Sequence, residues 1–164
     1  MTLHSRLVHL NELSDLCQKL ESELTRPYFV PWHTLPDLPH PALLRTLQAH
    51  MDWMNSCTIS PQGDYIVSAS VDWTLKLWDA RIGAVRFTLK GHTNWVNGCA
   101  ISPQGDFIVS ASDDQTFKLW SAQTGECLST LLVDGPLLSC AFHPDGEHIV
   151  AAGAGGVYFL RLVR

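Results

Sequence analysis

The sequence repeats itself with a period of 42 residues, as the dipeptide Thr-Leu at positions 46, 88 and 130 shows. Segments 59–70 and 101–112 read ISPQGDYIVSAS and ISPQGDFIVSAS, so the first two copies differ there at one position. The third copy is shorter and less similar. A repeat of this length is typical of folds in which each copy forms one unit that buries its apolar face against its neighbours. We therefore expect a short array of such units.

Each copy has the pattern of short antiparallel β-strands. A proline followed two residues later by a glycine marks a tight turn at 61–63, 103–105 and 144–146, because proline fixes φ and glycine tolerates positive φ. Between the turns, Val, Ile, Thr and aromatic residues alternate with polar ones, as in TLKLW at 74–78 and TFKLW at 116–120. Alternation with a period of two predicts half-buried strands. The predicted fold class is all-β.

The first two copies also share motifs at constant spacing. Each has a small residue and a histidine before the first strand, then a turn aspartate, then a tryptophan followed by Asp or Ser. The residues are Ala49-His50, Asp72 and Trp78-Asp79 in the first copy, and Gly91-His92, Asp114 and Trp120-Ser121 in the second. On these motifs, residues 43–164 resemble the WD-repeat family. The resemblance implies a partial β-propeller of three four-stranded antiparallel blades, with repeats at about 46–87, 88–129 and 130–164.

The resemblance further implies that a network of four hydrogen-bonded side chains braces each complete blade. The network joins the loop histidine, a serine of the second strand, the turn aspartate and the strand tryptophan. Buried polar groups of this kind are tolerated when every member has a partner. The residues are His50, Ser68, Asp72 and Trp78 in one copy and His92, Ser110, Asp114 and Trp120 in the other, with Ser70 and Ser112 as alternatives for the serines.

The third copy departs from this pattern. Val133-Asp134-Gly135 replaces Gly-His, Gly155 is expected at the position of the turn aspartate, and Arg161 is expected at that of the tryptophan. We therefore expect no network in this copy. A degenerate last copy is typical of terminal repeats.

Residues 1–26, before the repeats, are predicted to form an amphipathic helix, because leucines recur there at spacings of three and four with charged residues between them. We favour a helix packed on the propeller or on an absent domain over self-association, because so short a coiled coil is marginal. The frequent prolines of residues 27–42 predict a stiff, extended linker.

Three blades are too few to close a ring, since propellers usually contain about four to eight. Leu43–Gln48 are expected to supply the outer strand that is missing after Val163. The open edges require a neighbour, either a second copy that completes a six-bladed ring as a homodimer or the remainder of a larger parent protein. The proline-rich lead-in and the ending YFLRL resemble the C-terminal repeat arrays of bacterial STAND-class signalling ATPases, although the chain has no G-x4-G-K-[ST] phosphate-binding loop.

Charge and hydropathy argue against two classes of partner. The net charge is -5 and Lys and Arg are scattered, so no basic stripe is available for nucleic acid. The apolar runs are far shorter than the roughly 20 residues of a membrane span, and we see no signal peptide. We expect a cytoplasmic protein that binds neither nucleic acid nor membranes. In it, Cys57, Cys99 and Cys140 are expected to be small buried apolar residues.

No combination of residues argues for catalysis or metal binding. His50, Ser68 and Asp72 have the residue types of a hydrolase triad, but the same trio recurs in the second copy and coincides with the implied brace. His143 and His148 are separated by a turn without any Cys-x-x-Cys, so we interpret them as solvated turn histidines. We expect no enzymatic activity, no cofactor and no metal.

The residues that follow each histidine loop are the candidate binding residues. The resemblance places them at the rim of the central opening: Trp53 and Asn55, Trp95 and Asn97, and by position Leu138. Trp73 joins them as an exposed residue specific to the first blade, because its equivalent is Gln115. An aromatic residue beside Asn suits a protein interface, although each tryptophan can instead pack on the next blade. The predicted function is a non-catalytic protein-interaction scaffold, and the alternative is the sensor segment of a STAND-type protein.

Overall fold

The computed structural model describes residues 45–163, and its regular elements in that range are all β-strands. The strands are β1 (Met54–Ile59), β2 (Tyr65–Ser70), β3 (Leu75–Asp79), β4 (Val85–Leu89), β5 (Val96–Ile101), β6 (Phe107–Ser112), β7 (Thr116–Ser121), β8 (Cys127–Leu132), β9 (Leu137–Phe142), β10 (His148–Gly153) and β11 (Gly156–Arg161). The all-β prediction is confirmed. The predicted helix at 1–26 and the linker at 27–42 lie outside the described residues. No helix suited to crossing a membrane occurs within residues 45–163.

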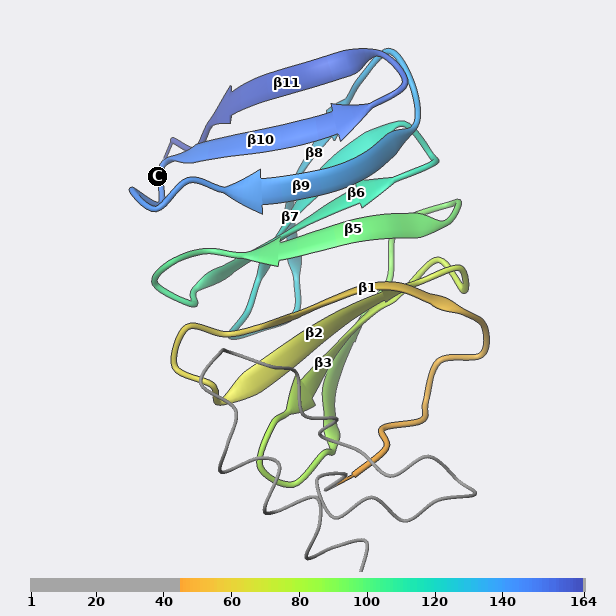
Figure 1. The fold of residues 1–164 in the computed structure, drawn as a ribbon, viewed down its shortest axis with the longest axis vertical. Coiled ribbons are helices and arrows are strands. Elements are labelled where there is room, and N and C mark those ends of the chain that lie inside the picture. The colour runs from red at the N-terminus through yellow and green to blue at the C-terminus, as the bar shows by residue number, and fades with distance from the viewer. Residues whose placement is uncertain (1–44, 164) are drawn as a thin grey trace, which may run out of the picture. The chain divides into compact units, whose positions relative to one another are not determined.

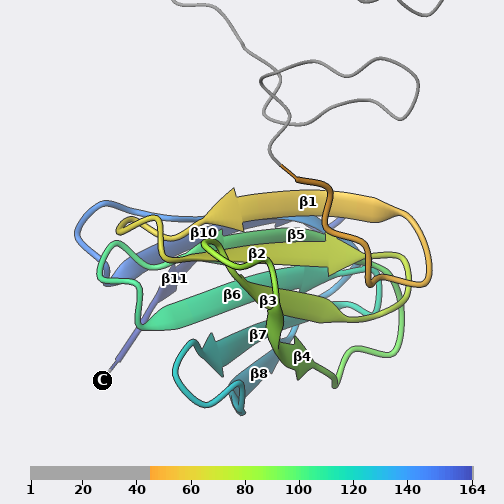
Figure 2. The same cartoon turned by 90° about the horizontal axis from the view of Figure 1, so that it is seen from below.

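The strands form three antiparallel sheets, each of consecutive strands. The sheets are β1–β4, β5–β8 and β9–β11, and we call them blades 1, 2 and 3. The first strands of the blades lie side by side, with β5 between β1 and β9 (Figure 1). Seen from below, blade 1 runs from β1 through β2 and β3 to β4, and blade 2 runs likewise from β5 to β8 (Figure 2).

The apolar core lies between the blades. Leu75 and Leu77 of blade 1 are fully buried in one cluster with Val96 and Ile108 of blade 2. A second cluster joins blades 2 and 3 and includes Phe117 and Ile149. Fully burying one such side chain stabilises the fold by about 1.5–3 kcal/mol. Each blade therefore depends on its neighbour for stability, as the repeat pattern predicts.

Blade 3 differs from its neighbours in two ways. Four strands per blade are confirmed for blades 1 and 2, whereas blade 3 has three, and residues 45–50, which include the described part of Leu43–Gln48, form no strand. The second difference concerns Arg161. Arg161 was expected at the position of the strand tryptophan, but in the structure Leu160 takes that position. Leu160 lies opposite Ile149 in blade 3, as Trp120 lies opposite Ile108 in blade 2. The reason is a shorter turn, with two residues between β10 and β11 where three separate β6 from β7.

The three repeat cysteines do not share one environment. Cys99 is buried, Cys140 is partly buried and Cys57 is exposed, so the prediction that all three are buried is wrong for Cys57. The Sγ atoms of Cys99 and Cys140 lie 3.8 Å from backbone carbonyls of the preceding blade, and burial raises the pKa of Cys99 to about 12. Cys57 has no preceding blade within residues 45–163, which explains its exposure.

Candidate interaction surface

A network of four side chains joins two loops of blade 1 at the end where β2 finishes. The His50 Nδ1–H group donates to Asp72 Oδ2 at 2.8 Å, and the Ser68 hydroxyl donates to His50 Nε2 at 2.7 Å. The Trp78 indole N–H donates to Ser68 Oγ at 2.8 Å. The loop before β1, strands β2 and β3 and the turn between them are thus held together.

Blade 2 repeats this network with nearly the same distances. His92 Nδ1 lies 2.8 Å from Asp114 Oδ2 and His92 Nε2 lies 2.7 Å from Ser110 Oγ. The Trp120 indole donates to Ser110 Oγ at 2.9 Å. The structure therefore brings together all eight residues of the implied braces. Burial lowers the pKa of His92, which favours the neutral ring that this geometry requires.

The alternative serines have a different role. Ser70 Oγ donates to the carbonyl oxygen of Trp53 at 2.8 Å and accepts the backbone N–H of Asp72 at 3.1 Å. Ser112 Oγ donates to the carbonyl oxygen of Asn94 at 3.3 Å, as Ser70 Oγ does to that of Asp52 at 3.4 Å, and accepts the backbone N–H of Asp114 at 3.1 Å. Ser70 and Ser112 thus anchor the same loops from outside the four-residue network.

The turn aspartates are ionised and fully engaged. Burial opposes ionisation of Asp72, but hydrogen bonds from Thr74, His50 and the Met51 N–H outweigh it and lower the pKa of Asp72 to about 2. Asp114 has a pKa of about 2 for the same balance of causes. Neither carboxylate is positioned to act as a base towards a substrate. Ser68 Oγ is buried between His50 and Trp78, so the trio lacks the accessible nucleophile of a hydrolase.

Large apolar side chains project from the loops that these networks hold. Met51 is 95% exposed, Trp53 82%, Trp73 51% and Trp95 49%. We call these four residues the tryptophan face. Their backbones are fixed: the Val71 N–H donates to the Trp53 carbonyl at 2.9 Å, and the Met51 N–H donates to Asp72 at 3.0 Å. The two segments of blade 1 that carry Trp53 and Trp73 therefore lie side by side.

Trp73 adopts a backbone conformation that is unusual for its residue type. Its φ is 69°, in the left-handed region, and Gln115 at the same position of blade 2 has φ 65°. A bulky residue in this region is strained by about 1–2 kcal/mol. The turn requires the conformation in both blades, but only blade 1 places a half-exposed tryptophan there.

Asn55 and Asn97, the asparagines of the predicted rim, link neighbouring blades. Asn55 Nδ2 donates to the carbonyl of Val96 at 3.2 Å and to Asn97 Oδ1 at 3.1 Å. Asn97 Nδ2 in turn donates to Asp113 at 2.6 Å and to the carbonyl of Leu137 at 2.9 Å. The amide donors of both residues are therefore engaged within the protein. Leu138, at the equivalent place in blade 3, is exposed.

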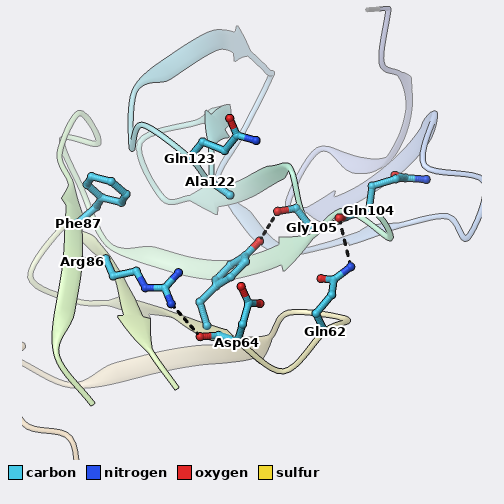
Figure 3. Close-up of a pocket in the computed structure, with 9 residues that line it drawn as sticks. Gln62, Asp64, Arg86, Phe87, Gln104, Gly105, Ala122 and Gln123 are labelled. Atoms are coloured by element: carbon cyan, nitrogen blue, oxygen red, sulfur yellow. Dashed lines mark hydrogen bonds between the residues drawn. The ribbon is translucent and has the colours of Figure 1, made fainter. Parts of the chain in front are cut away.

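The opposite end of the strands carries a groove that the sequence analysis missed. It has a volume of about 600 Å³ and lies between blades 1 and 2, lined by Gln62, Asp64, Tyr65, Arg86, Phe87, Gln104, Gly105, Ala122 and Gln123 (Figure 3). The Tyr65 hydroxyl donates to the Gly105 carbonyl at 2.9 Å, and Arg86 donates to the Asp64 carbonyl at 3.2 Å. Burial raises the pKa of Tyr65 to about 12. The sequence carried one sign of this groove: segments 59–70 and 101–112 differ only in that the first has Tyr65 where the second has Phe107.

Comparisons with known proteins agree with this architecture. The model of the family WD domain, G-beta repeat (WD40) matches residues 41–79, 83–121 and 125–158. The solved structure of the RRP9 WD40 repeats superposes with a TM-score of 0.70 at 21% identity, over 72% of this chain and 38% of that one. At this identity the superposition bears on the fold alone.

Two curated relatives are similar over shorter stretches. Protein pleiotropic regulator PRL2 of Arabidopsis thaliana is 28% identical over 72 residues, and pre-mRNA-splicing factor prp46 of Aspergillus fumigatus is 31% identical over 62. These stretches are 43% and 38% of this chain, and 13% of each relative. The predicted likeness to STAND-class arrays gains no support from these relatives. Because three matches of one family model cover most of the sequence, the chain belongs to the WD40 family.

Proposed function

We propose that this chain is a non-catalytic protein-interaction module that binds its partner through the tryptophan face. The observation that carries the proposal is the exposure of Met51, Trp53 and Trp73 on adjoining loops. Exposed aromatic residues held on a rigid support are typical of binding hot spots, because they bury a large area with little loss of conformational entropy.

The hydrogen-bond networks supply the rigid support. Met51 and Trp53 follow His50 directly, and Trp73 follows Asp72, so the network of blade 1 fixes the backbone under all three side chains. The residue type at position 73 adds a second argument: the turn requires a positive φ in both blades, yet blade 1 has a bulky tryptophan there where blade 2 has Gln115. Membership of the WD40 family, with relatives named as regulatory and splicing factors, supports a binding role. A cytoplasmic location and the absence of nucleic-acid binding stay predictions.

Site-specific cross-linking tests this assignment. A photo-reactive amino acid is placed at position 53 or 73 of the full chain in its native cells, and cross-linked proteins are identified by mass spectrometry. The control position is Ile82, which is exposed in the turn between β3 and β4 at the other end of the strands. One protein captured from positions 53 and 73 but not from 82 is expected. The same capture from all three positions, or from 82 alone, contradicts the assignment.

We also propose that a second copy of this chain covers the open faces of blades 1 and 3. Val157 and Phe159 of blade 3 are 60% and 83% exposed, whereas Leu75 and Leu77 occupy the same strand positions in blade 1 and are fully buried against blade 2. The free face of blade 1 exposes Met54 and Ile59 in the same way. Blade 3 thus exposes the face that would pack on a following blade, and blade 1 exposes the face that would pack on a preceding blade. Two copies can therefore pair blade 3 of each with blade 1 of the other, in two contacts related by a twofold axis.

Light scattering of the full chain in solution tests the dimer. A mass of two chains is expected, and replacement of Phe159 by Asp is expected to give single chains with unchanged circular dichroism. The control is Leu128→Asp, because Leu128 is exposed on the outermost strand of blade 2. A single-chain mass for the unmodified protein overturns the dimer and favours further blades of a larger parent protein as the covering element.

A further inference from the structure

A cluster of His143, Asp145 and His148 lies in the turn between β9 and β10. One ligand atom of each residue can be chosen so that all three atoms lie within 4.8 Å of one another. His143 Nδ1 is 2.9 Å and His148 Nδ1 is 2.7 Å from Asp145 Oδ2. All three side chains are exposed. The two histidines that were predicted to be solvated thus share Asp145 as a partner, which the turn places between them.

We propose that His143, Asp145 and His148 form a binding site for a divalent first-row transition-metal ion of the zinc class. Two imidazole nitrogens and one carboxylate oxygen are ligands that Zn²⁺ accepts. Ligand atoms at about 2.0–2.2 Å from a tetrahedral ion are roughly 3.3–3.6 Å apart. Binding replaces the Nδ1–Oδ2 contacts of 2.9 and 2.7 Å, and the exposed side chains rotate to separate these atoms. The fourth position stays open for water or for a side chain of a partner.

The carboxylate of the cluster is already held in place. Asp145 Oδ1 accepts the backbone N–H groups of Glu147 at 2.8 Å and of His148 at 3.0 Å. These bonds occupy one carboxylate oxygen and direct the other, Oδ2, to the two imidazoles. Hydrogen bonds that orient a ligand in this way are a common part of metal sites.

Comparison with the other two blades shows that the cluster is specific to the third. The same turn contains Ser60, Gln62 and Tyr65 in blade 1, at the positions of His143, Asp145 and His148. In blade 1 the serine hydroxyl accepts the backbone N–H groups of Asp64 at 3.0 Å and Tyr65 at 3.1 Å.

In blade 3 Asp145 takes over this bracing role, and His143 keeps only a long bond in the turn, from the backbone N–H of Asp145 to its Nδ1 at 3.3 Å. The backbone of the turn is nevertheless the same: the N–H of Gly63 donates to the carbonyl of Ser60 at 2.8 Å, and that of Gly146 donates to His143 at 3.0 Å. Three positions of one turn thus carry ligand types together while the turn itself is unchanged.

Titration calorimetry with Zn²⁺ on the full chain tests the site. Three variants restore the residues of blade 2: His143→Ser, Asp145→Gln and His148→Phe, after Ser102, Gln104 and Phe107. Because the same turn of blade 2 contains these residues, the variants should fold, and circular dichroism checks that they do. We expect one strong ion per unmodified chain, and weakening by about tenfold or more in each histidine variant, since even the loss of an outer partner costs about that much.

The other metal-binding groups of the chain require a control. Cys57 and Cys127 are exposed, so zinc that binds to thiols has to be distinguished from zinc at this turn. The absorption spectrum of the Co²⁺ complex does so, because thiolate ligands give an intense charge-transfer band that nitrogen and oxygen ligands lack. Zinc binding that is unchanged in the variants, a Co²⁺ spectrum with thiolate bands that persist in them, or no binding overturns the proposal.

Discussion

Replacing Ser110 by alanine should destabilise the protein far more than the loss of one hydroxyl group suggests. Ser110 Oγ is the hub of the blade 2 network: it donates to His92 Nε2 at 2.7 Å and accepts the Trp120 indole N–H at 2.9 Å. The His92 side chain is fully buried and Trp120 is 1% exposed, so water cannot replace the hydroxyl at either group.

The expected size of the effect follows from the two polar atoms that the substitution leaves unpaired. A buried polar group without a partner costs about 1–3 kcal/mol, so the free energy of unfolding should fall by about 2–6 kcal/mol. Alanine is compatible with the strand itself, because Ala151 occupies this position in blade 3, where Leu160 replaces the tryptophan. The cost therefore arises from the orphaned partners and not from the alanine.

Urea unfolding monitored by circular dichroism measures this change. At typical slopes of about 1–3 kcal/mol per molar urea, the midpoint should move by roughly 1 M or more. Ser129→Ala is the matched control, because Ser129 is an exposed residue of β8, and it should change stability by less than about 0.5 kcal/mol. If Ser110→Ala behaves like Ser129→Ala, the network does not brace the blade and the reasoning is refuted.

Acid should destabilise the fold for two reasons. Below about pH 6.5 His92 takes up a proton in the unfolded chain but not in the folded one, where its pKa is lowered, and the stabilisation from Asp72 and Asp114 is lost as the pH falls from their ordinary pKa of 3.8 to the folded value of about 2. Unfolding midpoints that stay level from about pH 7 to pH 3 would contradict this. Gly98→Ala should cost about 1–3 kcal/mol, because its Cβ would lie 3.0 Å from a backbone Cα atom of β9, and an unchanged midpoint in thermal unfolding would show that the blades can separate freely there. Trp73→Gly should raise the free energy of unfolding by about 1 kcal/mol by relieving the positive φ, while weakening partner binding; a loss of stability would mean that the indole contributes to the core.

The sequence predicted the braces because they rest on residue types at a constant spacing. What it left open was which serine takes part. Ser68 and Ser70 are separated by one alternation and so lie on the same face of β2. In the structure Ser68 Oγ lies within hydrogen-bond distance of the Trp78 indole, at 2.8 Å, whereas Ser70 ends the strand and donates to the loop at Trp53. Which of two serines on the same face joins the network depends on the packing between strands, and the alternation within one strand does not determine it.

Trp53 and Trp73 are exposed in the structure, and their place in a binding rim stays a prediction. The link that Asn55 and Asn97 make between blades was not foreseen. Both occupy a β-bulge, where the register shifts between residues 54 and 56 and between 96 and 98. A bulge re-aims a side chain, and here it directs each amide to the next blade. The alternation of apolar and polar residues gives no sign of a bulge. The sequence therefore could not reveal that these asparagines bond to the next blade.

The exposure of Cys57 shows a second limit of the sequence. Its surroundings depend on a blade before blade 1, which residues 45–163 do not contain. The identical strand position in blade 2 is buried because blade 1 covers it. Equivalent residues in a repeat therefore have equivalent environments only where both neighbours are in place.

The affinity of the cross-linked partner, once purified, is the most direct test of the central claim that the tryptophan face is the binding surface. Calorimetry compares the unmodified chain with a double variant, Trp53→Ala and Trp73→Gln, in which Gln follows Gln115 of the same turn in blade 2. Because hot-spot aromatics each contribute about 2 kcal/mol or more, the affinity should fall by roughly a thousandfold. The control Ile82→Ser should bind as the unmodified chain does. Equal affinities for the double variant and the unmodified chain would contradict the claim.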